Sequence, residues 1–72
     1  MNNLNVAKIQ LNGDPYEVIN GTNLNELLNK LKLQKNKIAI EVNGEIIEKN
    51  KYPNLILRRG DKVEIVHFIG GG

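Results

Sequence analysis

Residues 20–32 read NGTNLNELLNKLK and hold the strongest helical pattern in this chain of 72 residues. Four leucines recur at positions i, i+3, i+4 and i+7, which places them in one apolar stripe along a helix. They are Leu24, Leu27, Leu28 and Leu31. Asn23 can cap this helix with its side-chain oxygen, and Glu26 can complete a capping box. The pattern predicts a helix over residues 23–32.

Segments with strand patterns flank this helix on both sides. Before it, residues 4–11 and 16–19 are separated by Asn-Gly-Asp-Pro, and Asn-Gly is a strong hairpin signal. After it, residues 38–42 and 45–47 are separated by a second Asn-Gly. A hairpin, a helix and further strands predict an α+β domain with one helix on one face of a sheet.

The rest of the chain is a polar segment, an apolar segment and a last strand. Residues 49–53 include a proline and are expected to form a loop or a single helical turn. Residues 55–57 are either a short edge element or a segment that covers the core. Residues 62–69 form the last strand, whose two faces carry Val63, Ile65, His67 and Ile69 on one side and Glu64, Val66 and Phe68 on the other. We expect Val63 and Ile65 to face the core and Val66 and Phe68 to face outward.

The composition is that of one small globular domain, with 40% hydrophobic and 25% charged residues. A chain of this size buries about 60–65% of its unfolded surface, so its core is small. Three aromatic residues, Tyr16, Tyr52 and Phe68, predict a core made of Ile, Leu and Val. There is no cysteine, which excludes disulfides and thiolate metal sites. His67 is the only histidine and cannot form a zinc site by itself.

The charge pattern disfavours a nucleic-acid partner. Ten basic residues are nearly balanced by eight acidic ones, and only Arg58 and Arg59 form an adjacent arginine pair. The first residues lack the basic and apolar segments of a secretory signal, and no apolar run reaches transmembrane length. We expect a cytoplasmic protein without a membrane or nucleic-acid partner.

The most distinctive stretch is VEIVHFIGGG, residues 63–72, where a strand pattern runs into three glycines. No Ser or Cys nucleophile is present, and no helix follows the glycines to form a phosphate loop, so an enzyme is not expected. The chemical group that remains is the carboxylate of Gly72, which adenylation by ATP would activate. Gly70 and Gly71 lack a Cβ and can thread a narrow channel. The alternatives for this tail are a frayed end or a cloning remnant.

Four stretches carry a resemblance to a known family. They are Ile9-Gln10-Leu11-Asn12-Gly13, the run Gly21-Thr22-Asn23-Leu24-Asn25-Glu26-Leu27-Leu28, the run Ile38-Ala39-Ile40-Glu41-Val42-Asn43-Gly44-Glu45-Ile46-Ile47, and Gly60-Asp61-Lys62 with the ten residues that follow. On these residues the chain resembles the sulfur carriers of thiamin biosynthesis (ThiS type), within the ubiquitin-like β-grasp family. The resemblance implies a β-grasp domain over residues 1–69 and a flexible glycine tail over 70–72. It also implies a mixed sheet of four to five strands, one helix across it, and a last strand parallel to the first.

The resemblance further implies a mechanism. An adenylating enzyme of the ubiquitin-activating type would use MgATP, with no cofactor bound to the carrier, to form the Gly72 acyl-adenylate. A sulfur donor such as a cysteine desulfurase would convert it to a thiocarboxylate, and thiazole synthase would accept the sulfur. Val66, Phe68 and Ile69 are expected to contact partners, and the free protein is expected to be a monomer. The alternatives are a molybdenum-cofactor sulfur carrier, a ubiquitin-like protein modifier, or a plain binding module.

Overall fold

The computed structural model describes residues 5–68 and contains five strands, one α-helix and two 3-10 helices. The strands form one sheet in the order β2-β1-β5-β3-β4. The elements along the chain are β1 (Val6–Leu11), β2 (Asp14–Ile19), α1 (Leu24–Leu31), η1 (Lys35–Lys37), β3 (Ile38–Val42), β4 (Glu45–Ile46), η2 (Lys49–Asn54) and β5 (Lys62–His67). The predicted α+β class and the mixed five-stranded sheet with one helix are confirmed.

The helix α1 begins with the predicted capping box. The Glu26 backbone N–H donates to Asn23 Oδ1 at 2.8 Å, and the Asn23 backbone N–H donates to Glu26 Oε1 at 3.0 Å. The helix ends at Lys32, which adopts a left-handed conformation and bonds back to the last carbonyls. The leucine stripe is buried at Leu24, Leu27 and Leu28. Sequence alone therefore located both ends and the buried face of this helix.

Both Asn-Gly pairs form tight hairpin turns, as the sequence predicts. Asn12 and Gly13 have φ of 50° and 88°, and Asn43 and Gly44 have φ of 54° and 85°. Positive φ at both turn residues matches the right-handed twist of the strands, and Asn and Gly tolerate it best. The strand β2 starts at Asp14, earlier than the predicted residue 16, and so includes Pro15. A proline is compatible with this strand because β2 lies at the edge of the sheet.

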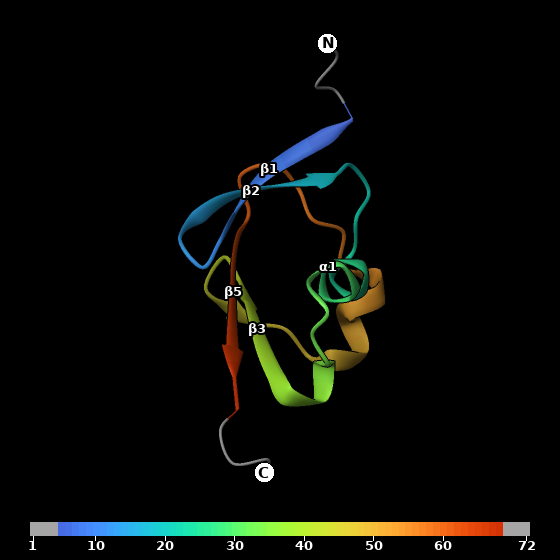
Figure 1. Cartoon of the computed structure of the whole chain (residues 1–72), viewed down its shortest axis with the longest axis vertical. Coiled ribbons are helices and arrows are strands. Elements are labelled where there is room, and N and C mark those ends of the chain that lie inside the picture. Colours follow the sequence, from blue (N-terminus) through green and yellow to red (C-terminus); the bar gives the residue numbers. More distant parts are fainter. Residues whose placement is uncertain (1–4, 69–72) are drawn as a thin grey trace.

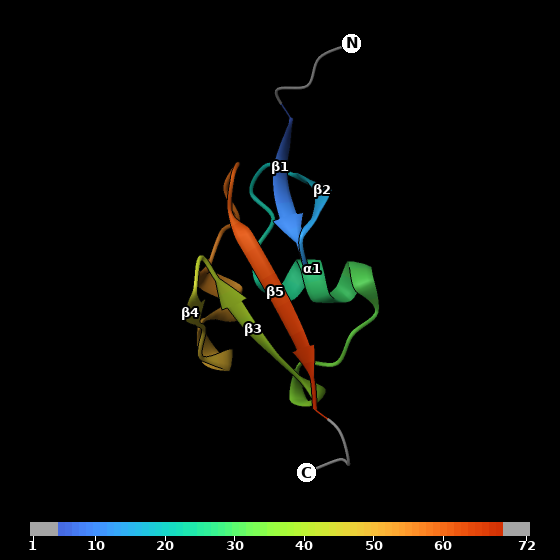
Figure 2. The same cartoon turned by 90° about the vertical axis from the view of Figure 1, so that its left-hand side faces the viewer.

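The last strand, β5, lies in the centre of the sheet. It pairs parallel to β1, with Gln10 opposite Lys62, and antiparallel to β3, with residues 38–42 opposite residues 63–67. Figure 2 shows β5 running between β1 and β3, with α1 behind the strands and β4 at the far edge. In Figure 1, α1 and η2 lie on the same side of β3 and β5, so the sheet has one covered face and one open face.

The core lies between the sheet and α1 and includes one aromatic side chain. The prediction of a purely aliphatic core is wrong, because Tyr52 in η2 is completely buried. The reason is that η2 packs against α1, so Tyr52 enters the core although most of the residues of η2 are polar. The other buried residues are Ala7, Ile9, Val18, Leu24, Leu27, Leu28, Ile38, Ile40, Val42, Leu57, Val63 and Ile65.

Residues 55–57 form a strap across the start of α1 rather than an edge strand. Leu57 N–H donates to the Thr22 carbonyl at 2.8 Å, and Leu24 N–H donates to the Leu55 carbonyl at 3.2 Å. Ile56 makes only an isolated bridge to Asn23, and Leu57 is buried. The core-covering alternative is the one that the structure supports.

Candidate functional site

The central strand β5 leads directly toward the glycine residues and is held from both sides. Ile65 N–H donates to Asn12 Oδ1 at 2.8 Å, and Lys62 N–H donates to Asn43 Oδ1 at 2.9 Å. After β5 ends at His67, Phe68 N–H still donates to the Lys37 carbonyl at 2.9 Å. The chain is therefore fixed to the sheet up to Phe68. Phe68 lies beyond the end of β5, although the sequence predicts a strand over residues 62–69; Ile69 lies outside the described residues.

Side chains along β5 alternate between the core and the open face of the sheet as predicted, except at its last residue, His67. Val63 is completely buried and Ile65 is 8% exposed, whereas Val66 is 58% and Phe68 52% exposed. His67, which sequence alternation places with the buried residues, is exposed, although Ile38 opposite it on β3 is completely buried. Two of the three predicted partner-contact residues therefore have accessible side chains. The third, Ile69, lies outside the described residues.

The exposed ring of Phe68 makes a cation–π contact with a lysine. Lys49 Nζ, from η2, lies 5.4 Å from the ring centroid. Such a contact at an exposed site contributes about 0.5–1 kcal/mol. This contact with η2 orients the Phe68 ring. The end of β5 therefore presents an aromatic surface with a lysine beside it.

The predicted tail residues Gly70, Gly71 and Gly72 also lie outside the described residues. Their roles, and the division into residues 1–69 and 70–72, stay predictions. The described residues show which part of the fold precedes the glycines. That part is the central strand β5, and not an edge strand, and Phe68 after it donates a hydrogen bond to the carbonyl of Lys37, the residue before β3.

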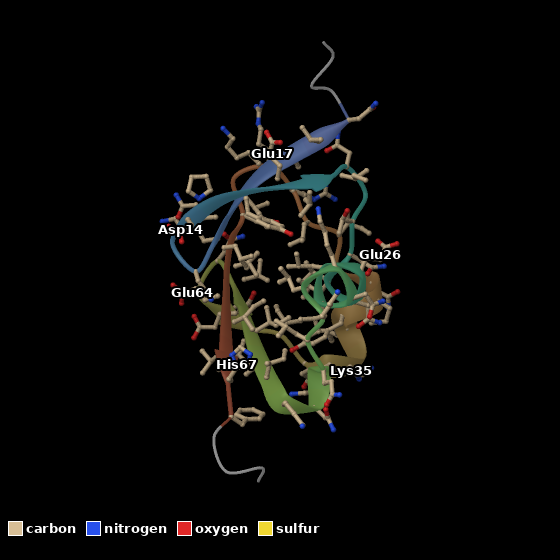
Figure 3. The ribbon with its side chains drawn as sticks, viewed as in Figure 1. Asp14, Glu17, Glu26, Lys35, Glu64 and His67 are labelled. Atoms are coloured by element: carbon tan, nitrogen blue, oxygen red, sulfur yellow. The ribbon has the colours of Figure 1, made fainter. Side chains whose placement is uncertain are left out.

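The open face of the sheet carries further residues that sequence reasoning missed. Ala39 stands opposite Val66, and Glu41 stands opposite both Glu64 and Ile46. Ile46 is 72% exposed. Alternation in residues 38–42 indicates which of them face outward, but their partners depend on strand register, which a single sequence does not contain. In Figure 3 the labelled Glu64 lies on the side of β5 away from α1.

Neither a metal-binding cluster nor a membrane-spanning helix is found within residues 5–68. No group of three or more His, Cys, Asp and Glu side chains is placed to hold a metal ion in this range. Among the same residues, no helix is long and apolar enough to cross a membrane. One pKa departs clearly from its ordinary value: burial raises the pKa of the Tyr52 phenol. This residue belongs to the core and not to the candidate site.

Comparison with known proteins decides the family. The model of the ThiS family matches residues 9–72. The chain belongs to the ThiS family. The predicted resemblance is thereby confirmed, and the match includes the three final glycines as well as β5.

Individual ThiS-family relatives extend this result. The chain is 38% identical to the sulfur carrier protein ThiS of Bacillus subtilis over 65 residues, which cover 89% of this chain and 98% of that protein. It is 35% identical to the crystal structure of a thiamine biosynthesis protein (ThiS) from Geobacter metallireducens, with a TM-score of 0.78 and coverage of 90% and 99%. The predicted β-grasp fold is that of this structure.

A third ThiS-family relative is a much larger protein. A thiazole synthase of Magnetococcus marinus is 42% identical over 65 residues, which cover 90% of this chain. The chain spans only 20% of the length of that protein. A region similar to this domain is thus part of a thiazole synthase in that organism.

Proposed function

We propose that this chain is the sulfur carrier of thiamin biosynthesis and carries sulfur as a thiocarboxylate on Gly72. Membership of the ThiS family, with a match that extends to residue 72, is the observation that carries the proposal. In this role the protein is a substrate of other enzymes and not a catalyst. The absence of Ser and Cys from the sequence agrees with this role, since the backbone carboxylate is then the group that holds sulfur.

The first step is activation of the carboxylate by an adenylating enzyme of the ubiquitin-activating type. A carboxylate oxygen of Gly72 attacks the α-phosphorus of MgATP, and pyrophosphate leaves. The product is an acyl-adenylate, in which AMP has become the leaving group. Glycines at 70 and 71 suit this step because a narrow active-site channel admits a chain without side chains.

The second step exchanges oxygen for sulfur. A donor that supplies sulfur at the level of sulfide attacks the acyl carbon, the acyl–oxygen bond breaks, and AMP leaves with that oxygen. If the donor is a persulfide, for example on a cysteine desulfurase, a thiol must also cleave the S–S bond to release the thiocarboxylate. Thiazole synthase then takes the sulfur from Gly72, which returns to the carboxylate form.

The described part of the structure supports a division of roles in these steps, in which the folded domain binds the partner and the glycine tail reacts. A partner can bind the exposed side chains of Val66 and Phe68 at the end of β5, and Ile69 would continue this contact. The strand is anchored through Phe68, so a partner that holds this end also sets where the tail begins. The thiamin pathway is favoured over the molybdenum-cofactor alternative by the family and by the carrier from Bacillus subtilis.

Intact-mass spectrometry tests the proposal. The protein is incubated with its adenylating enzyme, MgATP and a sulfur donor, and its mass should rise by the difference between sulfur and oxygen. Omission of ATP and deletion of Gly72 are the controls and should both prevent the rise. Lysine-linked adducts in place of the sulfur form would instead indicate a protein modifier.

A further inference from the structure

Phe68, the last described residue before the glycines, is held at two points by two different elements. Its backbone N–H donates to the carbonyl of Lys37, the last residue of η1, at 2.9 Å. The centroid of its ring lies 5.4 Å from Lys49 Nζ, at the start of η2. In Figure 3 the labelled His67 of β5 and Lys35 of η1 lie at the same end of the molecule. One contact therefore holds the main chain of Phe68, and the other holds its side chain.

Lys49 differs from the other lysines of the chain in its burial. Its side chain is half-buried, whereas all the other lysines are exposed. A lysine that buries its aliphatic stem keeps its ammonium group at the surface but has fewer rotamers to choose from. Its element is fixed as well, because Tyr52, one 3-10 turn further along η2, is completely buried. The ammonium group at the Phe68 ring is therefore held in place by the core of the domain.

The chain contains a second contact of the same kind, which serves for comparison. Lys30 Nζ lies 5.3 Å from the centroid of the Tyr16 ring and connects α1 to the edge strand β2. In the sheet, β1 separates β2 from β5, so this contact is remote from the residues that precede the glycines. The two contacts have nearly the same length, and the one at Phe68 differs in its position at the start of the tail.

The position of Phe68 limits where the reactive carbon of Gly72 can lie. Gly72 follows Phe68 by four residues, which span at most about 14 Å when fully extended. An enzyme that binds the folded domain must therefore hold its ATP within this distance of Phe68. The reacting atoms must also come to about 3–3.5 Å from each other. If Phe68 is already ordered in the free carrier, the enzyme has fewer residues to order before reaction.

We propose that Lys49 is a positioning residue for the adenylation of Gly72 and that it acts through the ring of Phe68. By holding this ring, Lys49 fixes the point from which residues 69–72 begin. The inference rests on the proposed function and assigns a residue outside the tail to its first step. Lys49 raises the fraction of bound carriers whose carboxylate lies next to the α-phosphorus of ATP. An exposed cation–π contact is strong enough to change such a fraction by about two- to fivefold.

Single-turnover adenylation of the whole carrier by its own adenylating enzyme and MgATP tests the proposal. Pyrophosphate release is followed over a range of enzyme concentrations, which separates the saturating rate from the half-saturating concentration. Lys49→Met keeps the unbranched stem and removes the charge. It should lower the saturating rate by about two- to fivefold and leave the half-saturating concentration unchanged, because docking is kept. Lys49→Arg should retain the wild-type rate, since a guanidinium also binds an aromatic face.

Substitution of the ring shows whether Lys49 acts through Phe68. Phe68→Leu removes the aromatic face, so adding Lys49→Met to this variant should not lower the saturating rate further. The matched control is Lys30→Met, which removes the contact to Tyr16 and should keep the wild-type rate. The contact itself has a readout in the free protein. The Hε protons of Lys49 should be shifted upfield by the ring in the NMR spectrum of the wild type, and this shift should vanish in Phe68→Leu.

Three results would overturn the proposal. They are a wild-type saturating rate in Lys49→Met, an equal loss of rate in Lys30→Met, and a loss of rate in Lys49→Met that persists in the Phe68→Leu background. The last result would assign Lys49 to a direct contact with the enzyme. If the wild type is not adenylated at all, the proposed function fails together with this inference. If the wild type is adenylated and Lys49→Met behaves like it, only the inference fails.

Discussion

Asn12 accepts a hydrogen bond through its side-chain Oδ1 from the backbone N–H of Ile65, at 2.8 Å and 53 positions apart in the chain. The first hairpin turn is thereby tied to the central strand. Asn43, in the other Asn-Gly turn, makes the equivalent contact to the backbone N–H of Lys62. Each asparagine thus has two roles, since it adopts positive φ in a turn and fixes β5 in the sheet.

Substitutions at Asn12 can separate these two roles. Asn12→Gly keeps the backbone conformation and removes the hydrogen bond, so it should lower the free energy of unfolding by about 0.5–1.5 kcal/mol. Asn12→Ala adds the cost of a positive φ and should be more destabilising by about 1 kcal/mol. Urea denaturation followed by circular dichroism gives both values. Equal stability of the Ala variant and the wild type would contradict the role assigned to this residue.

Tyr52 makes the stability of the domain sensitive to alkaline pH. Its hydroxyl is buried next to the backbone of Ile40 without a hydrogen bond of good geometry, and burial raises its pKa above the ordinary value of 10.0 although the Ile40 backbone acts in the opposite direction. The unfolded state releases the phenolic proton at lower pH than the folded state. The contribution to stability is therefore complete below about pH 10 and is lost as pH rises toward and through the folded-state pKa.

Tyr52→Phe should remove this dependence. The phenylalanine variant keeps the ring in the core and should be as stable as the wild type, or more stable, at neutral pH. Its free energy of unfolding should fall less than that of the wild type between pH 9 and 11, which denaturation at several pH values would reveal. Tyr16→Phe, at a half-buried position, is the control. A large loss of stability in Tyr52→Phe at neutral pH would mean that the hydroxyl has a stabilising partner.

Val66→Ser tests whether the exposed end of β5 contacts partners. The side chain is 58% exposed, so the change should cost less than about 1 kcal/mol of folding free energy. If Val66 lies in an interface, the affinity for thiazole synthase should fall by about tenfold. Ile19→Ser is the matched control, because Ile19 is an aliphatic residue with 67% exposure in the edge strand β2. Equal effects of the two substitutions on affinity would argue against a specific contact at Val66.

Local features of the sequence predict much of this fold. The capping residues Asn23 and Glu26 locate the start of α1, and the two Asn-Gly pairs locate both hairpins, because these signals act within a few residues. The buried Tyr52 could not be predicted in this way. Its burial depends on η2 packing against α1, which are distant in sequence. The same holds for Glu41 and Glu64, whose facing positions are set by strand register.

In the candidate site, too, local sequence predicts some features, whereas others depend on elements that are distant in the chain. The exposure of Val66 and Phe68 follows from the two-residue period of a strand and was predicted. The lysine at the Phe68 ring was not, because Lys49 comes from a separate element. Membership of the ThiS family supports the assignment of the glycines, since chemistry at a backbone carboxylate leaves no side-chain signature.

Localisation of the transferred sulfur tests the central claim most directly. The wild-type protein is treated with its adenylating enzyme, MgATP and sulfur donor, and the intact chain is then fragmented in the mass spectrometer. The account predicts that fragments containing Gly72 carry the mass increase of one oxygen replaced by sulfur, and that fragments ending before Gly72 do not. Sulfur found on any other residue, or an unchanged Gly72 under conditions in which the enzyme consumes ATP, would contradict it.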